Sequence, residues 1–226
     1  PPYDNLPGNL NTAPGDSPYA SGEHHFSNGS TWVDSLAKLL GVADSALPVR
    51  QNPVGTNYAQ AGTTAFPEGT PFPLGPLPCR VSFGTQIQAA IDRGGIPSDA
   101  LVTVEIGSND VVNAVLFFVD AITNQGLDPA TANAVTKSMV LEPAASITSS
   151  GINQLITGGV STLLWATVPD IGLTPSMAIL DAQLDAQSPV PLSGLIIATA
   201  TDFAETFNGL VEAGIQSGIV DGTIIK

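Results

Sequence analysis

Two apolar runs of strand length constrain the fold of this chain more than any other feature. The first covers residues 100–106 and is rich in β-branched side chains, and the second covers residues 161–168. Turn residues bound each run, and helical patterns lie before, between and after them. Because such runs are typical of strands buried on both faces of a parallel sheet, the pattern predicts βαβ units.

The segments around these runs have the apolar spacing and the end signals of helices. Helices are predicted over residues 31–40, 83–93, 111–122, 129–157 and about 193–213, and residues 222–225 begin a further strand. Ser30 is the expected N-cap of the first helix, which should bury a stripe of Trp32, Val33, Leu36, Leu39 and Leu40. The helix over 129–157 should break near Pro143. We predict a three-layer α/β fold of the flavodoxin-like type with a central parallel sheet, in one domain over residues 1–226.

Composition narrows the function classes. Six Lys and Arg residues stand against twenty Asp and Glu, a net charge of -14, and such a surface repels nucleic acid. No apolar run reaches the roughly 18 residues that predict a transmembrane helix. A sparse, acidic surface suits a protein that works outside the cell, so we expect a secreted monomer.

Residues that could hold a metal or cofactor are sparse in the sequence. The two histidines, His24 and His25, are adjacent, and no cysteine or carboxylate cluster lies near them at ligand spacing. The single cysteine, Cys79, cannot form an internal disulfide, and no histidine near it would activate its thiol. We therefore expect no metal and no cofactor.

The turn after the first run carries the most informative polar residues. Gly107-Ser108-Asn109-Asp110 follows the predicted strand directly, at the end of the sheet where parallel strands place ligands. Asn109 would present a neutral amide, which can stabilise an oxyanion without titrating. Asp110 is expected to cap a helix that begins at Val111. On their own, these four residues favour an ordinary strand-to-helix turn.

A second segment supplies a partner for Asn109. Residues 57–65 read Asn-Tyr-Ala-Gln-Ala-Gly-Thr-Thr-Ala, and they place Gly62 where its backbone N–H could join the Asn109 amide in an oxyanion hole. The segment lies in a long connection over residues 42–82 that is rich in proline and glycine. Connections of this length in a compact domain are often functional.

Several segments together resemble the GDSL/SGNH hydrolases, in the order that this family has them. The resemblance rests on His25-Phe26-Ser27-Asn28-Gly29, on residues 57–63 and on residues 107–110, with further likeness in residues 167–175 and 207–210. It covers nearly the whole chain and implies the SGNH hydrolase fold. It also implies hydrolysis of carboxylic esters by a serine nucleophile and a histidine base, with Gly62 and Asn109 as oxyanion-hole donors.

The nucleophile and the base that the resemblance implies are harder to place. Gly15-Asp16-Ser17 has the family's letters and makes Ser17 the candidate nucleophile of this chain. Its context differs from the family's, because no apolar run precedes it and Pro18 follows, whereas the nucleophile should stand between a strand and a helix. No histidine follows His25. We therefore expect a fold that is incomplete, without the N-terminal nucleophile block and the C-terminal Asp-x-x-His block.

Two functions stay open at this point. The first is an esterase or lipase acting on a small-molecule, lipid or acylated-glycan ester. The second is an inactive SGNH-like fragment, or a domain that binds acyl or glycan groups without cleaving them. Whether this polypeptide is an active enzyme depends on the nucleophile and the base.

Overall fold

The computed structural model describes residues 30–49, 53–60, 62–65, 82–188 and 192–226, and the chain divides into two compact units, Pro1–Ala61 and Gly62–Lys226. The first unit contains helix α1 (Trp32–Leu39) and a 3-10 turn, η1 (Ala43–Ala46). Thr31, and not the predicted Ser30, caps α1, because its hydroxyl accepts from the Asp34 N–H while the Asp34 carboxylate accepts from the Thr31 N–H.

The expected buried stripe of α1 is wrong. Ala37 is the one buried residue of the helix, whereas Leu39 is 85% exposed and Trp32 is 41% exposed. The periodicity correctly predicts that this segment is a helix, but it does not show whether another part of the protein covers the apolar face.

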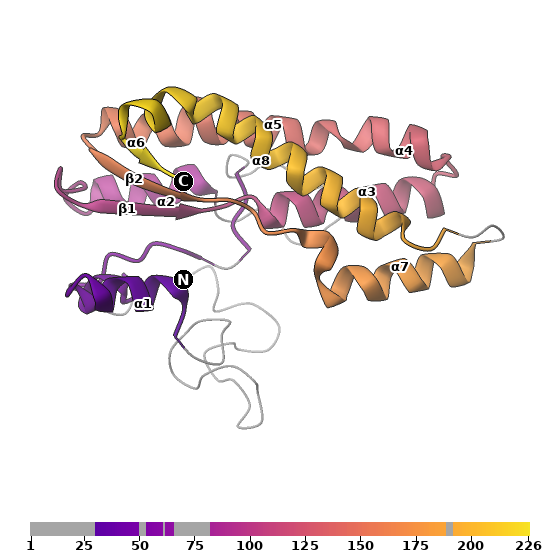
Figure 1. The fold of residues 1–226 in the computed structure, drawn as a ribbon, viewed down its shortest axis with the longest axis horizontal. Helices are drawn as coiled ribbons and strands as arrows, with labels where there is room; N and C mark the ends of the chain where they lie inside the picture. Colours follow the sequence, from indigo (N-terminus) through magenta and orange to yellow (C-terminus); the bar gives the residue numbers. More distant parts are fainter. Residues whose placement is uncertain (1–29, 50–52, 61, 66–81, 189–191) are drawn as a thin grey trace. The chain divides into compact units, whose positions relative to one another are not determined.

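The second unit contains a parallel sheet with the strand order β1-β2-β3 (Figure 1). The strands are β1 (Leu101–Glu105), β2 (Thr162–Ala166) and β3 (Ile224–Ile225). In the register of β1 and β2, Leu101 pairs with Thr162 and Glu105 with Ala166. The predicted α/β class and the parallel arrangement of these strands are confirmed.

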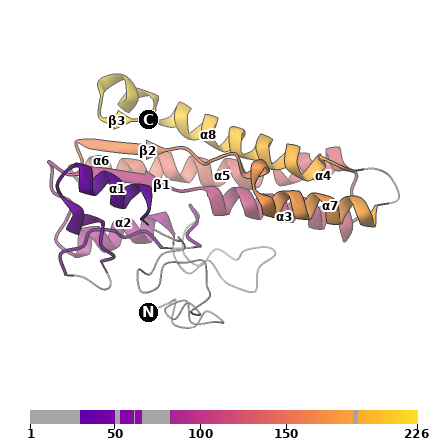
Figure 2. The same ribbon diagram turned by 60° about the horizontal axis from the view of Figure 1, so that its bottom comes forward.

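Helices make up most of the second unit. They are α2 (Phe83–Asp92), α3 (Ser108–Thr123), α4 (Pro129–Thr136), α5 (Ser138–Ser146), α6 (Asn153–Thr157), α7 (Pro175–Gln187) and α8 (Leu195–Asp221), with a π-helical turn, η2 (Ile147–Ile152), and a 3-10 turn, η3 (Ile171–Leu173). Figures 1 and 2 show the strands at one end of this unit and α3, α4 and α7 beyond their carboxyl ends. Helix α8 runs the length of both regions and returns the chain to β3.

Two helical predictions need correction. Helix α5 runs through Pro143, and the interruptions lie at Lys137, between α4 and α5, and in the π-helical turn η2. Helix α7 was not predicted, because its buried residues include a carboxylate, Asp181, and its Ile179 is 60% exposed. The apolar pattern of that segment is therefore weak.

One core joins the sheet to the helices of the second unit. Its largest fully buried side chains include Trp165 on β2, Phe118 on α3, and Phe203 and Phe207 on α8. Such aromatic side chains supply much of the apolar area that folding removes from water. Because Phe118 of α3 and Phe203 and Phe207 of α8 belong to the same core, α8 is packed against α3. Helix α8 also reaches the carboxyl ends of the strands, where the predicted site lies.

Candidate functional site

The turn at the carboxyl end of β1 needs glycine for two reasons. Gly107 has φ 117°, in the left-handed region that residues with a Cβ avoid, and it is the N-cap of α3. A Cβ placed there would also lie 2.2 Å from a ring carbon of Phe207 and 2.9 Å from a methyl carbon of Val168. The turn is thus pressed against α8 and against the segment that follows β2.

This turn brings Asn109 to the segment that contains Gly62. The Asn109 side chain is partly buried, and its Nδ2 donates a hydrogen bond of 2.8 Å to the Thr63 carbonyl oxygen. Gly62 precedes Thr63, is exposed and has φ 79°. Among the described residues, no partner accepts a hydrogen bond from the Gly62 N–H. The structure therefore brings the two chain segments that carry the predicted donors together.

Helices α2 and α5 also anchor the segment after Gly62. The Phe83 N–H donates to the Thr64 carbonyl at 2.9 Å, and Gln86 Nε2 donates to Thr63 Oγ1 at 2.7 Å. From α5, Ser146 Oγ donates to the carbonyl of Ala65 at 3.4 Å. Residues 63–65 consequently have a defined position relative to Asn109.

The sequence predicts that Asp110 caps a helix that begins at Val111, and this prediction is wrong. Helix α3 begins at Ser108, so Asp110 is its third residue, and its carboxylate turns away to accept the Ala65 N–H at 3.2 and 3.1 Å. The side chain is buried, with 1% exposed. Burial raises the pKa of Asp110 to about 7, against the hydrogen bonds from the backbone N–H groups of Ala65 and of Asp110 itself.

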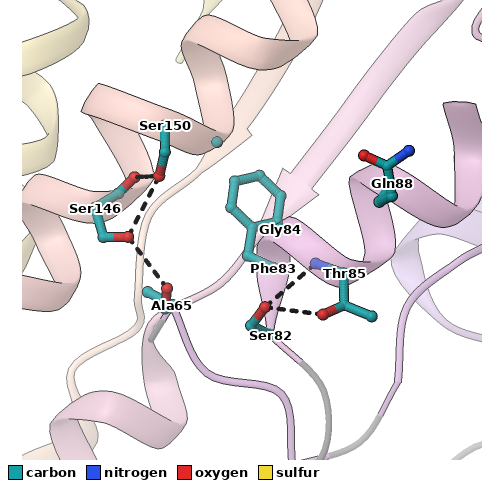
Figure 3. A pocket seen from close by; sticks show the side chains of 9 residues that line it. Ala65, Ser82, Phe83, Gly84, Thr85, Gln88, Ser146 and Ser150 are labelled. Carbon is teal, nitrogen blue, oxygen red and sulfur yellow. Dashed lines mark hydrogen bonds between the residues drawn. The ribbon is translucent and has the colours of Figure 1, made fainter. Parts of the chain in front are cut away.

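A cavity of about 330 Å³ is lined by Ala65 and by residues of α2, α5 and η2 (Figure 3). Serine hydroxyls line part of it, including Ser146 and Ser150, and the ring of Phe83 forms another part. The described lining residues are all uncharged: Ala65, Ser82, Phe83, Gly84, Thr85, Gln88, Ser146, Ser150 and Gly151. Ala65 therefore borders this cavity and also donates its N–H to Asp110.

Other residues singled out in the sequence lie outside the described residues. They are Ser17, His24, His25 and Cys79. Within the part of the chain that the structure describes, no three His, Cys, Asp or Glu side chains come together in a way that could hold a metal ion. No helix in that part is long and apolar enough to cross a membrane.

The sequence did not predict the hydrogen bonds that Asn208 on α8 makes to the backbone of Val168. Its Oδ1 accepts from the Val168 N–H at 2.9 Å, and its Nδ2 donates to the Val168 carbonyl at 2.8 Å. The neighbouring Phe207 is the residue that covers Gly107. A polar residue beside a buried phenylalanine in the middle of an apolar helix was the signal for such a role.

Comparison with known proteins agrees with the resemblance seen in the sequence. The family model of the GDSL-like lipase/acylhydrolases matches residues 11–221, which is most of the chain. No curated protein and no solved structure gave a significant match. The parallel sheet with its helical connections is consistent with the SGNH α/β fold. The chain therefore belongs to the GDSL-like lipase/acylhydrolase family, a family of hydrolases.

Proposed function

We propose that this chain is a carboxylic ester hydrolase in which the Gly62 N–H and the Asn109 amide form the oxyanion hole. The observation that carries this proposal is the hydrogen bond of 2.8 Å from Asn109 Nδ2 to the Thr63 carbonyl. It ties the residue after Gly62 to the first turn of α3, at the carboxyl end of β1. Parallel α/β sheets bind their ligands at that end of the strands.

The chemistry of Asn109 suits this role. A side-chain amide has two N–H donors, and the Thr63 carbonyl takes one of them. The second is left for the oxygen that becomes negative when a nucleophile attacks an ester carbonyl. Because an amide does not titrate, its contribution stays the same over the working pH range.

The remaining roles follow the family. In the family, a serine hydroxyl attacks the carbonyl carbon, a histidine takes its proton and passes it to the leaving alcohol, and water then hydrolyses the acyl-serine. Residues 26–226 of this sequence contain no histidine to serve as that base. Ser17 is the candidate nucleophile within this sequence, although no apolar run precedes it. Small-molecule, lipid and acylated-glycan esters are all proposed substrates, and an extracellular setting is part of the same proposal.

Asn109→Ala tests the oxyanion hole. Loss of one such donor typically lowers kcat by about 10²–10³-fold, so hydrolysis of p-nitrophenyl butyrate should fall by that factor. Asn124→Ala is the matched control, because it removes the same side chain at the far end of α3, where Asn124 donates to Asp120. A kcat that stays at the unmodified value in Asn109→Ala would reject the assignment.

Labelling with a fluorophosphonate decides between an enzyme and a domain that only binds. A chain with an activated serine should become labelled, and Ser17→Ala then shows whether Ser17 is the labelled residue. A chain that neither reacts with the probe nor hydrolyses the ester would instead be an inactive SGNH-like domain. In that event, binding of acyl or glycan ligands becomes the function to test.

A further inference from the structure

The backbone hydrogen bonds of residues 63–65 point alternately to two sides, as those of a central strand in a sheet do. The Thr63 carbonyl and the Ala65 N–H both bond to side chains in the first turn of α3. The Thr64 carbonyl bonds to the Phe83 N–H on the other side. In an extended chain, alternate residues turn their backbone groups to the same side. Side chains of α3 therefore occupy the place of a neighbouring strand.

Asp110 is the unusual member of this arrangement. Its carboxylate is 1% exposed, and both oxygens lie within 3.2 Å of a single backbone N–H, that of Ala65. Burial of a carboxylate is unfavourable, and an apolar side chain would fill the same space at lower cost. What an apolar residue at this position could not do is accept the Ala65 N–H, as the carboxylate does.

We propose that Asp110 is a positioning residue, which holds Ala65 while Asn109 holds Thr63 and so keeps Gly62 beside the Asn109 amide. This inference rests on the proposed oxyanion hole. Two adjacent residues of one rigid helix turn hold two points of the segment, which fixes both its distance and its direction. Gly62 lies directly before Thr63, so the position of its backbone depends on these two hydrogen-bonded points.

Asp181 shows what a carboxylate with a purely structural task looks like in this protein. It is 6% exposed and accepts from the Gly194 N–H at 2.7 Å and the Ile196 N–H at 2.8 Å, at the start of α8. Those bonds satisfy free N–H groups of a helix end. Asp110 instead bonds to a residue 45 positions away, beside Gly62. Asp181→Ala is therefore the matched control for Asp110→Ala.

Amide hydrogen exchange tests the position of the segment independently of activity. In Asp110→Ala, exchange of the Ala65 amide within residues 62–65 should rise by about tenfold or more, because this N–H loses its hydrogen-bond acceptor. Asp181→Ala should leave these amides unchanged and speed exchange at the start of α8. If exchange at 62–65 is the same in Asp110→Ala and the unmodified chain, Asp110 does not hold the segment, and the proposal is overturned.

Steady-state kinetics then test whether the position matters for the reaction. We expect kcat on p-nitrophenyl butyrate to fall about 100-fold in Asp110→Ala with little change in KM, since a donor displaced by about 1 Å costs that much. Asp110→Asn keeps one oxygen as an acceptor for Ala65 and should recover most of kcat. It also serves if Asp110→Ala does not fold.

The outcomes separate this proposal from the proposed function. Faster exchange at residues 62–65 with an unchanged kcat would overturn the positioning role, provided that Asn109→Ala is inactive. If Asn109→Ala is fully active, the oxyanion hole itself is wrong, and the positioning role for that hole is wrong with it. The exchange data alone would then still report that Asp110 anchors Ala65.

Discussion

The ends of β1 and β2 lie side by side and use their polar residues in opposite ways. After β2, Asn208 satisfies both backbone groups of Val168, and Asp170 Oδ1 accepts from the Gly172 N–H and from Thr201 Oγ1. These groups are occupied within the fold. After β1, Asn109 donates one N–H to Thr63, and among the described residues neither its second side-chain N–H nor the nearby Gly62 N–H has an acceptor.

The difference between the two strand ends distinguishes polar groups that hold the fold together from polar groups that could bind a ligand. A polar residue at the carboxyl end of a strand becomes a candidate for binding only if its donors are not consumed locally. By that measure, the β1 end is the one that we propose to be functional. The β2 end supports it, because Val168 and Phe207 are the residues that surround Gly107.

The largest effect is expected where the two ends touch. Gly107→Ala places a Cβ 2.2 Å from the Phe207 ring at φ 117°, so the free energy of unfolding should fall by about 3–5 kcal/mol. Urea denaturation measures this loss. Gly126→Ala is the control, because Gly126 has φ 70° but nothing within 4 Å of the added carbon, and it should cost about 1–2 kcal/mol. If both variants lose the same free energy of unfolding, the Phe207 ring moves aside without a measurable cost.

A smaller effect separates the β2 end from the β1 end. Asn208→Ala leaves the N–H and carbonyl of Val168 without their partner, so it should lower stability by about 2–3 kcal/mol. Because Asn208 does not face the substrate in this proposal, kcat of the folded variant should be unchanged, in contrast to Asn109→Ala. Asn153→Ala, which removes an exposed bond to Ser149, should cost less than about 0.5 kcal/mol. A large loss of kcat in Asn208→Ala would contradict the proposal that only the residues after β1 take part in the reaction.

The strands were predictable because their signal is local. Residues 100–106 and 161–168 are mostly apolar runs of strand length, which is typical of strands in a parallel sheet. In the structure, Val104, Leu163 and Trp165 are buried, and the other residues of β1 and β2 are partly buried or exposed. The strand expected at residues 222–225 is confirmed by β3, which pairs with Leu163 and Leu164. Helix α7 lacked that kind of signal, since Asp181 occupies one of its buried positions.

The site was only partly predictable, because its contacts are not local. The sequence indicated Asn109 and Gly62 through a resemblance, and their roles in an oxyanion hole stay predictions. The partner of Asp110 could not be inferred from neighbouring residues, because Ala65 lies 45 positions away. A local view assigned Asp110 to capping, which is the common task of an aspartate near the start of a helix.

Titration of Asp110 gives the smallest effect and tests the β1 end alone. Burial raises the pKa of this carboxyl from 3.8 to about 7, so the folded protein binds the proton more tightly than the unfolded chain does. The resulting stabilisation is complete below pH 3.8 and is lost as the pH rises through 7. Between pH 5 and pH 8, the unmodified chain should therefore lose on the order of 2 kcal/mol relative to Asp110→Asn, which carries no charge at either pH.

Asp120→Asn is the control for this titration, on the same helix but at its exposed end. Hydrogen bonds from Asn124 and Gln125 lower the pKa of Asp120 below 3.8, so this carboxylate stays ionised from pH 5 to pH 8. The stability difference between Asp120→Asn and the unmodified chain should consequently not change with pH. Urea denaturation at both pH values measures the two differences. A pH-independent difference for Asp110→Asn as well would show that the carboxyl at the β1 end is ionised throughout, and that its contact with Ala65 outweighs its burial.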